Sequence, residues 1–151
     1  MSRVEYNDGD NPSVYLWDSY VRRSTNSPRG QATLKEMEAA LLALPQKRLI
    51  DNYLCRKGDV CILGAVALER RIKGGESRET AIAKLESIDD DLDLEEGSAP
   101  EYARDRLGMA FSLAWSAMEQ NDEFYEGKTP EQRYEGVLAW VRERIKPEAR
   151  P

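Results

Sequence analysis

The sequence predicts a predominantly α-helical α+β domain, with about five to six helices and one small antiparallel β-hairpin near residues 48–62. Two observations lead to this class. Apolar residues recur at spacings of three and four along most of the 151 residues, which is the helical period. One pair of apolar runs flanks a glycine-containing turn, as in a hairpin. We expect a single domain at residues 13–146, between flexible ends at 1–12 and 147–151.

The first two predicted helices are separated by a loop. From residue 13, aromatic and β-branched residues share one helical face, although the same residue types also favour a strand. The residues of this face are Trp17, Tyr20 and Val21. Turn-forming residues at 24–30 predict the loop, and residues 31–44 form a helix with a stripe of leucine and methionine, ended by Pro45.

The hairpin is predicted from two apolar runs, at residues 48–55 and 59–62, around a three-residue turn that contains glycine. We expect the second strand to bend at Gly64 into a helix at residues 63–72, which a glycine pair ends. Because an isolated hairpin is marginally stable, it must pack against the helices.

The C-terminal half predicts four more helices and one acidic loop. The helices are expected at residues 76–87, 98–107, 109–120 and 130–145. Ser77 caps the first of them, and capping boxes at 98–101 and 129–132 begin the second and the fourth. The third is apolar nearly all round, which predicts a central and buried position. The acidic loop is expected at residues 89–97.

The composition excludes several kinds of chemistry. The chain has no histidine, which excludes a Ser-His-Asp triad, a Cys-His pair and mixed Cys/His zinc sites. Cys55 and Cys61 lie among apolar residues, and we expect buried free thiols in a reducing compartment. No glycine-rich phosphate loop is present. We therefore expect no cofactor, no metal and no enzymatic activity.

No apolar run approaches the ~20 residues of a membrane span, and no targeting segment is visible, so we expect a cytoplasmic protein without membrane contact. Charge is distributed unevenly along the chain. Residues 1–85 carry 14 basic and 11 acidic side chains, whereas residues 86–151 carry 8 and 17. An acidic half argues against direct nucleic-acid binding and is compatible with a basic protein partner or with a homo-oligomer.

The acidic loop supplies the first candidate binding residues, Asp89, Asp90, Asp91, Asp93, Glu95 and Glu96. Three of the aspartates alternate as Ca²⁺ ligands do. The EF-hand pattern then requires glycine and glutamate where this chain has Leu94 and Pro100. A solvated acidic surface that contacts a basic partner is therefore favoured over a metal site.

A second group of candidate binding residues, Asn121, Asp122 and Glu123, follows the apolar helix. Together with Glu126 and Lys128, they provide the carboxylates and the lysine that metal-dependent nucleases use. The competing interpretation is structural, because Asn and Asp form turns and end helices. We favour the structural interpretation and keep a small metal-dependent phosphodiesterase as an alternative function.

A second alternative is a nucleic-acid-binding accessory protein. Basic pairs occur at Arg22-Arg23, Lys47-Arg48, Arg56-Lys57 and Arg70-Arg71, with aromatic residues between them. No nucleic-acid-binding motif accompanies the basic pairs, so an ordinary mixed surface is favoured.

Several strings of the chain together look like those of one group of proteins. They are Gly30-Gln31-Ala32, Leu44 to Ile50, Val60 to Ala65, Asn121-Asp122-Glu123 and Thr129 to Arg133. Over most of residues 29–145, the chain resembles small uncharacterised proteins encoded by tailed bacteriophages and prophages. The resemblance implies a virus-encoded accessory protein in a bacterial cytoplasm, and it offers no functional residues to carry over. We expect it to bind a host or viral protein, as an acidic inhibitor of a host defence or nucleic-acid-handling protein.

Overall fold

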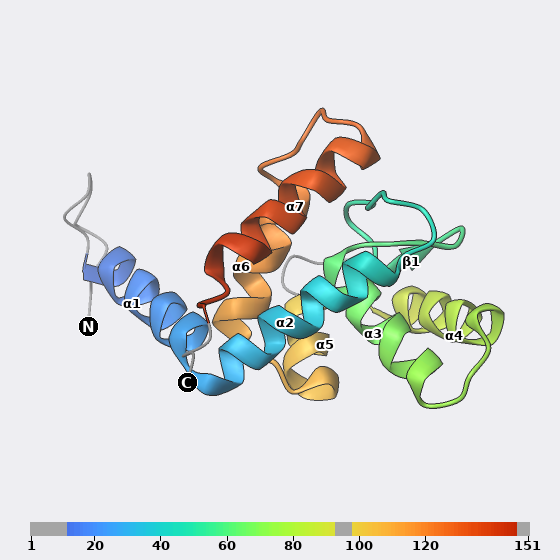
Figure 1. Cartoon of the computed structure of the whole chain (residues 1–151), viewed down its shortest axis with the longest axis horizontal. Helices are drawn as coiled ribbons and strands as arrows, with labels where there is room; N and C mark the ends of the chain where they lie inside the picture. The colour runs from blue at the N-terminus through green and yellow to red at the C-terminus, as the bar shows by residue number, and fades with distance from the viewer. Residues whose placement is uncertain (1–11, 93–97, 148–151) are drawn as a thin grey trace.

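The computed structural model describes residues 12–92 and 98–147, which form seven helices and a two-stranded antiparallel sheet (Figure 1). The elements are α1 (Pro12–Asn26), α2 (Pro28–Ala43), β1 (Cys55–Arg56), β2 (Asp59–Val60), α3 (Ile62–Lys73), α4 (Arg78–Asp91), α5 (Ser98–Leu107), α6 (Phe111–Asp122) and α7 (Pro130–Arg144). The predicted class is confirmed, and the seven helices of the described residues correspond to the seven segments that the sequence predicts as helical.

Helix α3 lies at the centre of the core, with α2, α4, α5 and α6 packed around it. Its first seven residues, from Ile62 to Leu68, are all buried. The sequence predicts this central position for residues 109–120 instead. In α6, however, Phe111 and Trp115 remain partly exposed, although the ring of Trp17 in α1 packs edge-on against Trp115.

The predicted loop at residues 24–30 is mostly helical. Helix α1 extends into it, and the chain breaks only at Ser27, whose hydroxyl accepts a hydrogen bond from the N–H of Gly30 and caps α2. Gly30 is required there, because a Cβ atom would lie 1.6 Å from the carbonyl oxygen of Ser24. The helical interpretation of α1 is confirmed over the strand. Tyr20 is nevertheless 50% exposed, because α1 packs only against α2 and α6.

The hairpin has the predicted turn but much shorter strands. Lys57 and Gly58 both have positive φ angles, 54° and 83°, as a type I′ turn requires. Residues 48–54 do not form a strand. Side chains of the helices bind several of their backbone groups, and Ile50 and Leu54 bond to the backbone of residues 60 and 61. Gly64 is not a bend. It lies inside α3, where a Cβ atom would be 1.9 Å from the carbonyl oxygen of Leu54.

Helix α4 runs further than predicted. It includes the first three residues of the expected acidic loop, Asp89, Asp90 and Asp91. The prediction of a loop at these positions is wrong, because the buried side chains of Leu85 and Asp89 hold the last turns of α4 against the core. The other acids of that loop, Asp93, Glu95 and Glu96, lie outside the described residues.

Two predicted helix starts are confirmed. The hydroxyl of Thr129 accepts a hydrogen bond from the N–H of Gln132 at 3.1 Å, and the side chain of Gln132 accepts one from the N–H of Thr129 at 2.9 Å. This capping box begins α7, which packs against α2 and α6. Ser77 caps α4 as predicted. None of the helices in the described ranges has the length and apolar character needed to cross a membrane.

Candidate functional site

The polar group predicted after the apolar helix is largely inside the protein. Asn121 belongs to the last turn of α6 and is fully buried. Its Oδ1 accepts a hydrogen bond from the N–H of Ile62 at 3.0 Å. Its Nδ2 donates to the carbonyl of Ile50 and to Oδ1 of Asp122, each at 2.8 Å. A single side chain therefore joins α6 to the chain before and after the hairpin.

Arg133 on α7 completes this junction and is 5% exposed. Its Nε donates to the carbonyl of Asn121 at 2.7 Å, and a second nitrogen donates to the carbonyl of Leu49 at 3.3 Å. A further nitrogen donates to the carbonyl of Tyr125 at 3.4 Å, and a carboxylate oxygen of Asp51 lies 3.6 Å away. A buried guanidinium requires such partners, because an unpaired charge in the interior is costly.

Two of the predicted binding carboxylates bond to the backbone of the same segment. Oδ1 of Asp89 accepts a hydrogen bond from the N–H of Leu54 at 2.9 Å. Oδ1 of Asp122 accepts one from the N–H of Asn52 at 3.4 Å. Burial raises the pKa of both carboxyls above the ordinary value of aspartate, and the hydrogen bonds oppose this shift.

We call Asn121, Asp122, Arg133 and Asp89 the polar clamp. From three helices, their side chains bind four backbone groups of residues 49–54. The N–H of Ile50 and the carbonyl of Leu54 bond instead to the backbone of residues 60 and 61. Backbone groups buried without a partner would destabilise the fold, so the polar clamp satisfies groups that the short hairpin leaves unpaired. The structural interpretation of Asn121 and Asp122 therefore agrees with their contacts.

The other described candidate residues are exposed. They are Asp90, Asp91 and Glu123. Across residues 12–92 and 98–147, no three Cys, Asp or Glu side chains lie close enough to hold a metal ion. The metal-dependent phosphodiesterase alternative thus finds no support in the geometry of this part of the chain.

Both cysteines are buried free thiols, as predicted. Burial raises the pKa of each thiol to about 12, so both are protonated at neutral pH and are poor nucleophiles. Cys61 has a structural role instead. Its Sγ accepts a hydrogen bond from the N–H of Gly64 at 3.3 Å and caps α3.

The connection between α6 and α7 carries a feature that was not found from the sequence. Phe124 is 66% exposed, more than any other large apolar side chain in the described residues. Glu123 and Glu126 flank it and are also exposed, and Glu119 lies one helical turn before Glu123. We call Glu119, Glu123, Phe124 and Glu126 the acidic tip. Figure 1 shows this connection at the top edge of the view, far from α1.

The backbone of the acidic tip is fixed by turns. The N–H of Phe124 donates to the carbonyl of Glu119 at 3.2 Å. The N–H of Glu126 donates to the carbonyl of Glu123, also at 3.2 Å. The exposed phenyl ring is therefore attached to an ordered turn, which limits the positions that it samples.

Tyr125 anchors the same turn from the inside. Its ring fills the space beside Gly136 of α7, where a Cβ atom would lie 2.0 Å from the ring. Its carbonyl accepts a hydrogen bond from Arg133 of the polar clamp. Of two adjacent aromatic residues, one thus packs inward while Phe124 faces solvent. The sequence signal for this feature was an aromatic pair within a polar turn.

Negative charge is concentrated at the acidic tip. Partial burial and the charge of Glu123 raise the pKa of Glu119. The opposite end of α7 is basic, with Arg142, Arg144 and Lys146. This end lies against α2, since the N–H of Lys146 donates to the side chain of Gln31 at 2.8 Å. At this end Arg142 pairs with Glu38 at 2.7 Å and Arg144 lies 3.8 Å from Glu143, so part of the positive charge is neutralised.

Comparison with known proteins adds no relative: no family model, no curated protein and no solved structure matches this chain. The resemblance to phage and prophage proteins therefore stays a prediction from the sequence. The site is interpreted from its own geometry.

Proposed function

We propose that the protein is a non-enzymatic accessory protein that binds another protein through the acidic tip. The observation that carries this proposal is the 66% exposure of Phe124 on a turn fixed by hydrogen bonds. Burial of an aromatic ring against a partner is favourable in water. Because the turn is already ordered, binding requires little further loss of conformational entropy.

The charges around Phe124 support a basic partner. Glu119, Glu123 and Glu126 repel the phosphates of nucleic acids and attract lysine and arginine side chains. Proteins that handle nucleic acids carry such basic surfaces. The proposed role is therefore inhibition of a host or viral nucleic-acid-handling protein, by occupation of its basic surface. The resemblance to phage and prophage proteins supports the same setting.

The test captures partners from a bacterial host lysate with the immobilised full-length protein and its variants. Phe124→Ala removes the exposed ring, and Glu123→Lys with Glu126→Lys reverses the charge. Leu16→Ala is the matched control, because Leu16 is a 55% exposed apolar side chain on the distant helix α1. We expect wild type and the control to retain one basic protein that both test variants lose.

Undiminished retention of that protein by both test variants would contradict the proposal. A further variant, Asp90→Asn with Asp91→Asn, tests the exposed acids of α4 that were predicted as binding residues. Loss of the partner by this variant, but not by Phe124→Ala, would move the interface from the acidic tip to the end of α4.

A further inference from the structure

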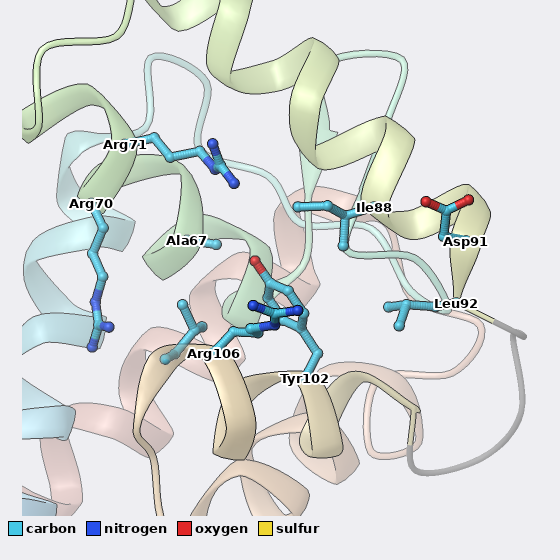
Figure 2. A pocket seen from close by; sticks show the side chains of 9 residues that line it. Ala67, Arg70, Arg71, Ile88, Asp91, Leu92, Tyr102 and Arg106 are labelled. Atoms are coloured by element: carbon cyan, nitrogen blue, oxygen red, sulfur yellow. The ribbon is translucent and has the colours of Figure 1, made fainter.

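A pocket with a volume of about 660 Å³ opens between α3, α4 and α5 (Figure 2). Sites for small molecules usually have about 300–1,000 Å³. Much of the wall is apolar. It consists of Ala67 of α3, Ile88 and Leu92 at the end of α4, and Tyr102 and Leu107 of α5. Ile88, Leu92 and Tyr102 are only partly buried, so a ligand that covered them would remove apolar surface from water.

Arginines provide the positive charge of the pocket. Arg70 is held at its edge by Glu36, which accepts two hydrogen bonds from the guanidinium, at 2.6 and 2.8 Å. Arg71 uses one nitrogen for Glu76, at 3.2 Å, and Figure 2 shows its guanidinium directed into the pocket. Its other N–H groups remain available to a ligand.

Arg106 has no hydrogen bond or ion pair with any other described residue, and its side chain is exposed. Arg106 and Tyr102 of α5 both line the pocket, as Figure 2 shows. A guanidinium offers five N–H donors in a fork that matches a carboxylate or a phosphate. Arg106 is therefore the group best placed to bind an anion here.

The pocket has different chemistry at its two ends. Arg71 and Arg106 lie on one side, whereas Asp91 lies beyond Ile88 and Leu92. A ligand that fits both ends carries an anionic group at the arginines and a flat apolar body against Tyr102. Inorganic phosphate matches the arginines but leaves the apolar wall uncovered.

We propose that this pocket binds a small organic anion, a carboxylate or a phosphate monoester attached to a flat apolar body, with Arg106 as the main contact to the anionic group. The site is independent of the acidic tip, which lies on other elements.

The test is isothermal titration calorimetry on the full-length protein with four probes: phenyl phosphate, benzoate, inorganic phosphate and neutral benzyl alcohol. We expect at least one aryl anion to bind, with inorganic phosphate and benzyl alcohol about tenfold weaker or more, since each lacks one half of the interaction. Comparison of phenyl phosphate with benzoate identifies the preferred anionic group.

Three variants assign the binding to the pocket. Arg106→Gln removes the unpaired guanidinium, and we expect about a tenfold loss of affinity for the aryl anion. Arg106→Lys keeps the charge without the fork and should lose less. Arg104→Gln is the matched control on the same helix, because Arg104 is paired with Asp105 and does not line the pocket.

Failure of both aryl anions to bind the folded wild type would overturn the proposal. Unchanged affinity in the folded Arg106→Gln variant would overturn it as well. Equal affinity for inorganic phosphate and phenyl phosphate would contradict the proposal that the ligand carries a flat apolar body. Circular dichroism of each variant shows that the fold is retained, as expected for an exposed side chain.

Discussion

Asn121 and Phe124 are three residues apart, and their environments are the reverse of what their side chains prefer. The polar Asn121 is fully buried, whereas the apolar Phe124 is 66% exposed. Each hydrogen-bonding atom of the Asn121 amide has a partner in the protein. The Phe124 ring is left to solvent on an ordered turn.

This contrast separates a residue that the fold requires from one that it does not. Burial of an amide is favourable only when its hydrogen bonds are satisfied, as they are in the polar clamp. The exposed ring of Phe124 buries little apolar surface in the fold and so contributes little to its stability. Substitution of Asn121 should therefore change the free energy of unfolding, whereas substitution of Phe124 should change partner binding.

The largest effect is expected from Gly64→Ala. The new methyl group would lie 1.9 Å from the carbonyl oxygen of Leu54, so α3 and the clamped segment would have to move apart. We expect the free energy of unfolding to fall by about 3–5 kcal/mol. Gly74→Ala is the control, since its Cβ has 3.3 Å to the nearest atom. Equal stability of the two variants in urea unfolding would refute the close approach.

Asn121→Ala should have the next largest effect. It leaves the N–H of Ile62 and the carbonyl of Ile50 without partners in the core. We expect a loss of about 2–4 kcal/mol in the free energy of unfolding, measured by urea denaturation. Gln120→Ala changes the neighbouring, partly exposed residue and serves as the control. A cost of Asn121→Ala no larger than that of Gln120→Ala would show that the polar clamp is unimportant.

Substitution of Asp89 tests the contribution of a charged side chain to the polar clamp. Asp89→Ala leaves the N–H of Leu54 unpaired and should cost about 1–3 kcal/mol in urea unfolding. Asp89→Asn keeps an oxygen that can accept this hydrogen bond and removes the buried charge. It should therefore be at least as stable as wild type at pH 7.

The pH dependence of this pair follows from the raised pKa of Asp89, which burial causes. Between the ordinary value of 3.8 and the higher folded value, the folded state binds more protons than the unfolded state. The Asp89 contribution to stability therefore rises as the pH falls through this window. The advantage of Asp89→Asn over wild type should be present at pH 7 and vanish below about pH 4. An advantage that grew on acidification would contradict this assignment.

The smallest effect on stability is expected from Phe124→Ala. Because the ring is mostly in solvent, the free energy of unfolding should change by less than about 0.5 kcal/mol. Partner retention should nevertheless be lost, as proposed above. A destabilisation above about 1 kcal/mol in urea denaturation would instead place the ring in the fold.

Local signals in the sequence predicted local structure well. The capping box at Thr129 and Gln132 and the cap at Ser77 depend on residues three apart, so they can be read without knowledge of the fold. The turn at Lys57 and Gly58 is equally local. The fold class followed from these signals and from the helical period of the apolar residues.

Features that depend on distant contacts were not predictable. Residues 48–54 have a strand-like composition, but several of their backbone groups bond to side chains from α4, α6 and α7. Asp89 belongs to a run of acidic residues that predicts a loop. It is nevertheless buried in α4, where its carboxylate accepts a hydrogen bond from the N–H of Leu54. The hydrogen bonds of Asn121 agree with the structural interpretation that the sequence favoured, although its partners could not be read from the sequence. Nothing in the sequence distinguished the exposed Phe124 from the partly buried Tyr125.

The polar clamp also sets the order in which the chain can complete its fold during synthesis. Ile62 finds its partner 59 residues later, at Asn121, and Leu49 finds its partner 84 residues later, at Arg133. Until α6 and α7 have left the ribosome, the backbone groups that Asn121 and Arg133 bind must keep their hydrogen bonds with water. A nascent chain that holds only the first three helices therefore already contains the apolar residues of α3. The contacts that Asn121 and Arg133 make around them have not yet formed.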